Sequence, residues 1–499
     1  MGWHQPTGTP RWPIRITKDV DASAGNVTPG QVGRVLGVDA PLRPVQPPLV
    51  EEKEHTRMEP KLAQTDVAVV GGGMAGLTAA CYLARAGLGV TVFEKAPGLG
   101  GRAATRESEG FLFNRGIHAL YTGGAASRVF RELGVAYGHG TPKETFVLDG
   151  AELRPFPTSP SQFLRTGLLD AADKLALFRL LAALSRTKPR DLAGMSLREW
   201  LDAKVRRPPV HRLMVSLAYP LVYTSALDLV SAEVFVDKFQ RALKHPIHYV
   251  DGGWRVLVEG LRAEAERGGA RFVSYARVER VEVSDGRARG LRLRDGSLVR
   301  AQAVVVATGP GDAARLVDGG SHAALSKVVE SLTPGLVACL DVALERLPSP
   351  DVPVVQDLGG PRFMTAQSLY SKVAPRGGAL LYTFKQLDPR RPGDPREDER
   401  DLEDLLDRAQ PGWREVLVKR QYLPRMEAVG ALPTASGGGF AGRPGQRVPD
   451  LESLYLAGDW VGPEGFLVDA SVGSARSAAR SVLEDGVSSR KREAAGSLR

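Results

Sequence analysis

The chain between residues 65 and 102 alternates short hydrophobic runs with clusters of glycine. Val67–Val70 is wholly apolar and predicts a buried strand, and Val90–Glu94 predicts a second, parallel strand. Between them, small apolar residues recur at helical spacing and predict a helix that Gly87 terminates. The pattern therefore predicts a β-α-β unit with glycine-rich turns.

The turn after the first strand has the glycine spacing of a dinucleotide site. Gly71 suits a tight turn, Gly73 lets the backbone approach a pyrophosphate, and Gly76 lets the helix pack closely on the sheet. Met74 and Ala75 open the helix, whose N-terminus offers unpaired amides and a positive dipole end to phosphates. A purely structural glycine turn is the alternative, and the order of strand, helix and acidic residue weighs against it.

A second set of candidate ligands follows the second strand. Glu94 is placed to accept hydrogen bonds from ribose hydroxyls, and Lys95 comes directly after it. Gly100 and Gly101 let a longer ligand lie against the backbone, and Arg102 can form charge-assisted bonds to a phosphate. A nicotinamide site would not need this second cluster, so the pattern favours FAD.

The last hydrophobic run, Leu454–Leu456, precedes a glycine, an aspartate, a tryptophan and a helix of small residues. With the glycine clusters and Arg102, this order resembles the FAD-dependent amine oxidase superfamily, which includes monoamine oxidases, protoporphyrinogen oxidases and phytoene desaturases. The resemblance extends from about Gln64 to Leu483 and is nearest to phytoene desaturase-like and protoporphyrinogen oxidase-like members. It implies FAD as the cofactor.

The resemblance also implies roles for individual residues. Gly458 and Asp459 match the turn whose aspartate contacts the ribityl-pyrophosphate part of FAD. Ala470 and Ser471 match the start of the helix that points its N-terminus at the flavin. Val278 matches the position that meets the adenine. The predicted cofactor contacts therefore come from segments far apart in the sequence.

The segment Phe111–His118 resembles the part of the family that passes beside the isoalloxazine ring, which makes Gly116 and His118 candidate contacts. Many family members have aspartate where this chain has Asn114, so the segment departs from the pattern. A histidine hydrogen-bonded in a structural turn is an equally good interpretation of His118. We assign it no acid or base role, and no catalytic residue is predicted.

These elements predict an α/β protein, with a Rossmann-type FAD-binding domain built on a parallel sheet and intertwined with a mixed α+β substrate domain. The FAD-binding domain is expected to comprise residues 62–155, 245–312 and 448–485. The substrate domain is expected to comprise residues 156–244 and 313–447. An N-terminal extension, 1–61, is either a small β module with a linker or a segment upstream of a start at Met58, and 486–499 is expected to be a mobile tail.

The expected substrate domain is rich in apolar residues at helical spacing. Phe163–Leu184 has this periodicity with Arg and Lys at its polar edge, and Ser196–Glu199 predicts a capping box that begins another helix. Such helices suit a cavity for a hydrophobic small molecule. They are typical both of a domain core and of a surface that rests on a membrane, and the sequence leaves both open.

The motifs thus predict a flavoenzyme that moves hydride from a hydrophobic, isoprenoid- or carotenoid-like substrate to FAD. Amine oxidation or protoporphyrinogen oxidation on the same scaffold is the alternative, and a non-catalytic FAD-binding protein is another. No second nicotinamide fingerprint occurs in the sequence, which favours oxygen, a quinone or another diffusible electron acceptor.

The composition of the chain excludes further classes of function. The net charge of +9 is spread over 66 basic and 57 acidic residues, and no basic-aromatic motif indicates nucleic-acid binding.

Two cysteines, Cys81 and Cys339, provide neither a disulfide framework nor a cysteine-rich metal site, so we predict no metal. Cys339 is far from the C-terminal flavin segment, where family resemblance would place a covalent thioether, so noncovalent FAD is expected. Without an apolar span or signal core, a cytoplasmic location is expected, with association at a membrane surface left open.

Overall fold

The computed structural model of the chain describes residues 64–157, 160–391 and 393–496. The chain divides into the units Met1–Thr56 and Arg57–Arg499, and all described residues belong to the second. The N-terminal extension and its two alternatives lie outside the described residues.

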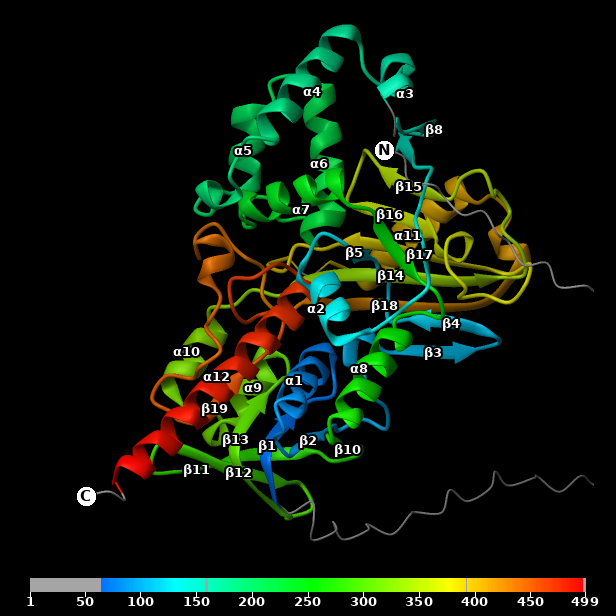
Figure 1. Ribbon diagram of the computed structural model, residues 1–499. Helices are drawn as coiled ribbons and strands as arrows, with labels where there is room; N and C mark the ends of the chain where they lie inside the picture. The colour runs from blue at the N-terminus through cyan, green and yellow to red at the C-terminus, as the bar shows by residue number, and fades with distance from the viewer. Residues whose placement is uncertain (1–63, 158–159, 392, 497–499) are drawn as a thin grey trace, which may run out of the picture. The chain divides into compact units, whose positions relative to one another are not determined.

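The first sheet contains seven strands within the described residues, in the order β10-β2-β1-β13-β12-β11, with β19 paired to β13 (Figure 1). Their bounds are β1 Gln64–Val70, β2 Val90–Phe93, β10 Arg271–Val273, β11 Val278–Ser284, β12 Arg287–Leu293, β13 Leu298–Val306 and β19 Leu454–Leu456. β10, β2, β1, β13 and β19 run parallel, and β12 and β11 continue the sheet antiparallel. The predicted Rossmann-type unit is confirmed.

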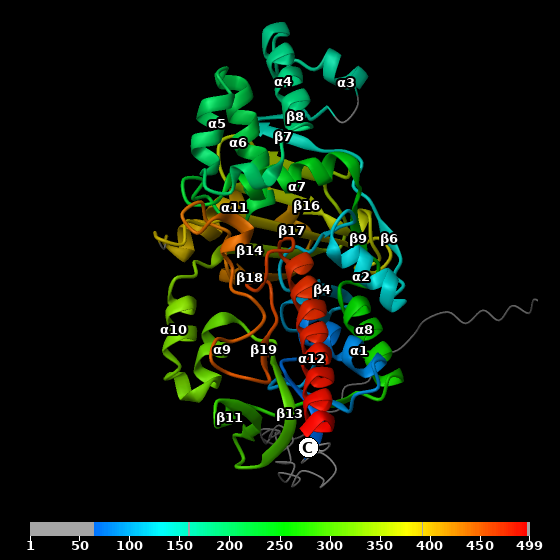
Figure 2. The same cartoon turned by 60° about the vertical axis from the view of Figure 1, so that its left-hand side comes forward.

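Helices cover both faces of this sheet because its central strands are apolar on both sides. On one face pack α1 Met74–Arg85, α2 Ala125–Leu133, α8 Arg255–Arg267 and α12 Val468–Gly496 (Figures 1 and 2). On the other lie α9 Pro310–Leu316 and α10 Ala323–Glu330. α12 continues as a helix to Gly496, into the segment after residue 485 that the sequence predicts as a tail.

The second sheet has the order β18-β14-β17-β16-β15-β7-β8 among the described residues. Its strands are β7 Phe146–Asp149, β8 Glu152–Pro155, β14 Gly335–Leu344, β15 Val354–Asp357, β16 Arg362–Ala366, β17 Ala379–Gln386 and β18 Leu417–Val429. α11 Pro395–Ala409 packs on it (Figure 1). We expected residues up to 155 in the FAD-binding domain, but β7 pairs with β15, because its buried Val147 and Leu148 continue the apolar layer of this sheet. The division as a whole stays a prediction.

A group of helices lies beside the second sheet (Figures 1 and 2). They are α3 Pro160–Arg165, α4 Ala171–Leu184, α5 Leu197–Lys204, α6 Pro208–Val222 and α7 Ala232–Lys244. The apolar period of Phe163–Leu184 is divided between α3 and α4, because Asp170 caps a new helix by accepting from the amide of Asp173. The capping box of Ser196 and Glu199 is confirmed. None of the helices in the described ranges is long and apolar enough to cross a bilayer.

Two small sheets connect the large ones. Their strands are β3 Thr105–Ser108 and β4 Phe111–Asn114 in one, and β5 Leu120–Tyr121, β6 His139–Gly140 and β9 Ile247–Val250 in the other. Asn114 Oδ1 accepts from the amide of Trp254 at 3.1 Å, and Thr105 Oγ1 accepts from the amide of Arg255 at 3.0 Å. The β3-β4 hairpin therefore caps α8, and this gives Asn114 a structural role.

Candidate functional site

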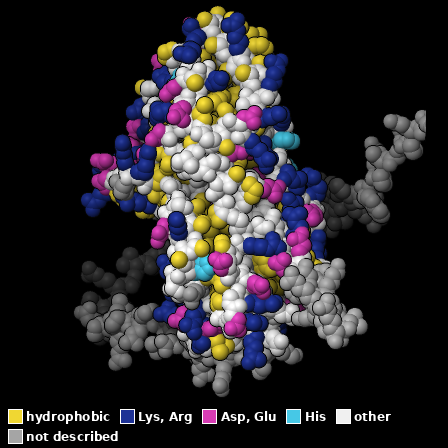
Figure 3. All heavy atoms as spheres, turned by 90° about the vertical axis from the view of Figure 1, so that its left-hand side faces the viewer, with side chains coloured by type: hydrophobic (Ala, Val, Ile, Leu, Met, Phe, Trp, Pro, Cys, Tyr) yellow, Lys and Arg dark blue, Asp and Glu magenta, His cyan; other side chains and the backbone are white. Residues whose placement is uncertain are grey.

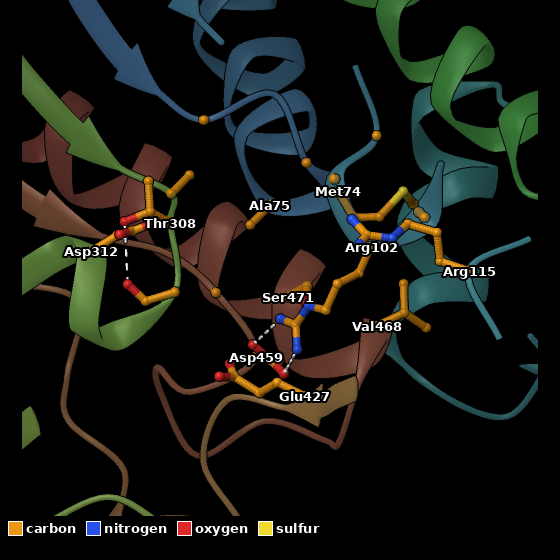
Figure 4. A pocket seen from close by; sticks show the side chains of 18 of the residues that line it. Met74, Ala75, Arg102, Arg115, Thr308, Asp312, Glu427, Asp459, Val468 and Ser471 are labelled. Carbon is orange, nitrogen blue, oxygen red and sulfur yellow. Dashed lines mark hydrogen bonds and ion pairs between the residues drawn. The ribbon is translucent and has the colours of Figure 1, made fainter. Parts of the chain in front are cut away.

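A cavity of about 1050 Å³ is lined by residues from both large sheets and from the helices between them. Most of the predicted cofactor residues line it: Gly71, Gly73, Met74, Ala75, Glu94, Lys95, Gly100, Gly101, Arg102, His118, Val278, Gly458, Asp459 and Ser471. Figure 4 shows how Met74, Arg102, Asp459 and Ser471 converge from separate segments. The fold thus brings together residues that the sequence separates by 400 positions, from Gly71 to Ser471.

Three predicted residues do not line the cavity. A Cβ atom on Gly76 would lie 1.9 Å from the carbonyl oxygen of Gly71, so this glycine permits the close approach of α1 to the turn. Gly116 has φ +75°, and a Cβ there would lie 2.8 Å from Met426 Cε. Ala470 is fully buried in α12. As cofactor contacts these three stay predictions, and their visible role is packing behind the cavity wall.

The turn into α1 forms an open cradle at a helix N-terminus. Gly71 has φ +104°, and a Cβ there would lie 2.6 Å from the carbonyl oxygen of Ala307, so only glycine fits. Gly73 is the N-cap of α1 and makes no side-chain capping bond. A Cβ on Gly73 would meet only the carbonyl oxygen of Gly100, at 3.9 Å. The backbone amides at the start of α1 therefore face free space that suits a pyrophosphate.

Glu94 and Lys95 are both fixed at the wall of the cavity. The Glu94 carboxylate accepts from the amides of Gly72 and Ala96, each at 2.8 Å, and the residue is buried. Lys95 Nζ forms an ion pair with Asp312 at 3.0 Å. These contacts hold the carboxylate at the end of β2, where a ribose would be expected.

Arg102 and Asp459 form a bidentate pair across the cavity (Figure 4). The two nitrogen-oxygen distances are 2.9 and 2.5 Å, and the amide of Gly430 donates to Asp459 at 2.8 Å. Burial by itself would raise the pKa of Asp459, but the Arg102 guanidinium and the Gly430 amide outweigh it and hold this pKa below its usual value. The glycine cluster after β2 and the turn after β19 are thus joined by a charged pair.

His118 Nδ1 lies 2.9 Å from the carbonyl oxygen of Gly116, and its ring meets the edge of Trp254 with centroids 4.7 Å apart. The side-chain amide of Gln367 donates to the carbonyl oxygen of His118 at 2.6 Å. Burial lowers the pKa of His118, so the imidazole is neutral at pH 7. His118 therefore both stabilises its turn and lines the cavity, and it still has no assigned proton-transfer role.

The C-terminal helix is tied to the turn that precedes it. Ser474 Oγ accepts from the amide of Gly458 at 2.9 Å and donates to its carbonyl oxygen at 2.8 Å. Ser471, in the first turns of α12, lines the cavity. The cavity thus has a second helix N-terminus, which can stabilise negative charge on a polarisable ring.

The chemical groups of these residues suit the parts of FAD. The cradle at Gly73 and the guanidinium of Arg102 would hold the phosphates, and Glu94 would hold a ribose. The segment from Gly116 to His118 and the start of α12 would border the ring. Val278, at the expected adenine position, and Ser471, at the expected ring position, line the same cavity, as a bound dinucleotide requires.

The sequence profile of the flavin-containing amine oxidoreductases matches residues 74–483. The chain belongs to this family. The predicted family resemblance and the prediction of an FAD-dependent oxidoreductase are therefore both confirmed.

Curated relatives of this flavin oxidoreductase include the zeta-carotene-forming phytoene desaturase of Myxococcus xanthus, 27% identical over 48% of this chain and 52% of that protein. The 4,4'-diapolycopen-4-al dehydrogenase of Metabacillus indicus is 24% identical over 80% of this chain and 93% of that protein. Among solved structures, an oxidoreductase from Methanosarcina mazei superimposes with a TM-score of 0.68 at 21% identity, covering 83% of this chain and 99% of that one. The chain spans about half or less of the length of the first curated relatives it matches.

Several residues of the flavin oxidoreductase's cavity were missed by the sequence reasoning. Most are charged or aromatic, and two of them directly precede predicted contacts: Arg115, Tyr121, Tyr223, Lys238, Trp254, Thr308, Glu427, Phe466 and Asp469. For Lys238 a signal was present. It follows Val234 and Phe235 by four and three positions, which places a lysine on the apolar face of a helix.

Proposed function

We propose that this flavin oxidoreductase oxidises a hydrophobic, isoprenoid- or carotenoid-like substrate, with FAD held noncovalently. The supporting observation is the character of the cavity wall beyond the cofactor residues. It consists mostly of apolar and aromatic side chains: Ile117, Ala119, Tyr121, Tyr223, Val337, Met426, Phe466, Leu467 and Val468. Such a wall gains free energy by burying hydrocarbon and excludes water from the reacting carbon.

Bound FAD supplies the redox chemistry by accepting a hydride from the substrate. The protein positions the two partners and keeps the site dry, and oxygen, a quinone or another diffusible acceptor removes the electrons afterwards. Neither Cys81 nor Cys339 is among the residues that line the cavity, which supports a cofactor without a cysteinyl link. The two curated relatives above, a phytoene desaturase and a diapolycopenal dehydrogenase, also favour an isoprenoid.

Amine oxidation is the alternative on this scaffold. A buried lysine, Lys238, lines the cavity, and its positive charge would repel a protonated amine. This repulsion disfavours amines relative to neutral or acidic substrates.

The proposal is tested by mixing the anaerobic holoprotein with detergent-dispersed phytoene or with primary aliphatic amines and following the flavin band near ~450 nm. We expect the isoprenoid to bleach the band and the amines to leave it unchanged. Bleaching by amines alone would overturn the isoprenoid assignment. A flavin that is photoreduced normally but bleached by no candidate substrate would instead indicate a non-catalytic FAD-binding protein.

We further propose that the surface of α3 and α4 rests on an anionic membrane, from which a lipid-soluble substrate is drawn. Leu164 and Phe178 are 72% and 65% exposed, and Arg165 and Arg179 are exposed beside them. Figure 3 shows hydrophobic and basic side chains together at the top of the view, at the height of α4 in Figure 1. Apolar side chains among basic ones match a lipid surface with negative headgroups.

The acidic residues of this region do not cancel its charge. Asp170 and Asp173 share the single guanidinium of Arg207, and Arg165, Lys174 and Arg179 leave this region with a net positive charge.

The membrane surface is tested by sedimentation of the full chain with phosphatidylcholine vesicles, with and without phosphatidylglycerol. We expect binding only with the anionic lipid and a loss of binding in L175D. Leu298 in β13 is the matched control, because it is 51% exposed against 49% for Leu175. Equal binding of L175D and L298D would contradict the proposal.

A further inference from the structure

Lys238 is a buried cation in the wall of the cavity. It belongs to α7, is only 2% exposed, and lines the cavity with Tyr121, Tyr223 and Asp469. Its Nζ lies 3.5 Å from the centroid of the Tyr121 ring, a cation-π contact. In the part of the chain that the structure describes, this Nζ makes no hydrogen bond and no ion pair.

The nearest carboxylates are engaged elsewhere. Asp237 forms a bidentate pair with Arg241, with distances of 2.8 and 2.9 Å. Asp469 accepts from the amide of Ala126 at 2.8 Å and lies beyond ion-pair distance of Lys238. Neither carboxylate therefore neutralises the ammonium at close range.

Keeping this ammonium buried costs free energy. Burial lowers the pKa of Lys238 to about 8, even though Asp469 and Asp237 act in the opposite direction. A cation-π contact offsets only a small part of the cost of burying an ion. A methionine would fill the same space without this cost, so a lysine here indicates a ligand with an acceptor atom.

Lys238 lies away from the predicted phosphate contacts, so the ligand that it would bind is not the phosphate part of the cofactor. The predicted phosphate contacts are at the start of α1 and at Arg102. Lys238 instead lies among Tyr121, which follows His118 by three residues, and Asp469, which precedes Ser471 by two. These neighbours lie next to the two segments predicted to border the flavin ring, where the substrate must bind.

We propose that the Lys238 ammonium binds an oxygen atom of the substrate, a carboxylate or aldehyde oxygen carried by a hydrophobic chain. This inference rests on the proposed function, because it assumes that the apolar wall holds an isoprenoid. Within that class it adds a preference for oxygenated isoprenoids over pure hydrocarbons such as phytoene. A charge-assisted hydrogen bond in a dry cavity is strong enough to select between them.

The test compares ligands of one prenyl chain length, farnesoic acid, farnesal, farnesol and farnesene, on the anaerobic holoprotein. Dissociation constants come from the change of the flavin spectrum. We expect the ratio of the farnesene to the farnesoic acid constant to fall at least about tenfold from wild type to K238M. Because each ligand is compared between two proteins, differences in ligand hydrophobicity cancel.

Lys244 provides the matched control, because it is an exposed lysine at the end of the same helix. K244M should leave the ratio unchanged, and K238Q should reproduce K238M if the methionine variant misfolds. The melting temperature of FAD-saturated K238M should rise, because an unpaired buried charge is removed. A lysine that only supports the fold would lower it.

The outcomes separate this inference from the proposed function. A ratio that is the same in wild type and K238M overturns the role of Lys238, even if isoprenoids bleach the flavin. A Lys238-dependent preference for the acid upholds that role, even if no ligand of the series bleaches the flavin and the proposed reaction fails. A lower melting temperature with an unchanged ratio identifies Lys238 as structural.

Discussion

The charged side chains at the two ends of the cavity differ in whether they have a partner of opposite charge or a hydrogen-bond donor. At the nucleotide end, Glu94 accepts from two backbone amides, Lys95 pairs with Asp312, and Asp459 pairs with Arg102. At the other end, Lys238 is buried with an aromatic ring and no ion pair within the described residues. Paired charges keep a fixed geometry around a cofactor that stays bound. An unpaired charge lowers stability, and we interpret Lys238 as a group that recognises a substrate, which binds and dissociates in each turnover.

The largest expected effect is on the cradle at α1. Gly73 has free space around its missing Cβ, whereas a Cβ on Gly76 would collide with the Gly71 carbonyl at 1.9 Å. G73V should therefore fold but bind FAD about 10–100-fold more weakly, because the new side chain fills the place of the pyrophosphate. Calorimetric titration of the apoprotein with FAD measures this.

G76A is the comparison for that experiment. It should lose stability in urea unfolding with or without FAD, since the collision is with backbone. If G73V is unstable without FAD, or binds FAD like wild type, the space at Gly73 does not belong to the cofactor.

The paired charges of the nucleotide end predict a pH dependence. The pKa of Asp459 is held below its usual 3.8. Its contribution to stability is therefore complete above about 3.8 and is lost as the pH falls through the lower folded pKa. Flavin fluorescence measures the release of FAD as the pH is lowered. The release curve of the wild type should contain a transition that belongs to the protonation of Asp459, and the curve of D459N should lack it.

D459N should also bind FAD about tenfold more weakly at pH 7, because Arg102 loses its charged partner. Arg102 is partly open to the cavity, so solvent moderates the effect. Unchanged affinity in D459N would remove the pair from the cofactor site.

The buried Lys238 and the partly buried Lys385 should respond to alkaline pH in opposite directions. The pKa of Lys238 is lowered from 10.5 to about 8, so between these values the unfolded chain binds more protons and the contribution of Lys238 to stability rises. For Lys385, burial lowers the pKa, but Asp398 and Asp401, at 2.7 and 2.5 Å, outweigh it and raise the pKa. Its stabilising contribution is complete below pH 10.5 and is lost above it.

Urea unfolding of K238M from pH 7 to 10, and of K385M from pH 7 to above the usual lysine pKa of 10.5, measures the contrast. K238M should be more stable than wild type by up to about 3 kcal/mol at pH 7, and the gain should shrink toward pH 10. K385M should be less stable at pH 7, because it leaves two carboxylates without their cation. A stability gain of K238M that does not change with pH would contradict the buried charge.

The smallest expected effect concerns the hairpin that connects the two ends. N114A removes the acceptor for the amide of Trp254 and should lower the free energy of unfolding by about 1 kcal/mol. N114D keeps an acceptor and should retain most of the stability. Loss of FAD affinity in N114A beyond this effect would show that Asn114 also acts on the cofactor.

Much of the nucleotide end could be predicted because its signals are local. The turn at Gly71, the helix after it and Glu94 lie within 24 residues, and each obeys a spacing rule that short-range geometry imposes. The capping box of Ser196 and Glu199 was predictable for the same reason. The pairing of β7 with β15 was not, because a four-residue apolar strand carries no mark of which sheet it joins.

The sequence by itself determined the family, the dinucleotide motif, the first sheet's β-α-β unit and the apolar periodicity of Phe163–Leu184. Only the tertiary structure decided that Arg102 pairs with Asp459, that Asn114 caps α8, and that Lys238 has no ion pair within the described residues. The physical reason is that a charge acquires its energy from its surroundings. Those surroundings are assembled from segments hundreds of residues apart, so burial and pairing appear only when the chain is folded.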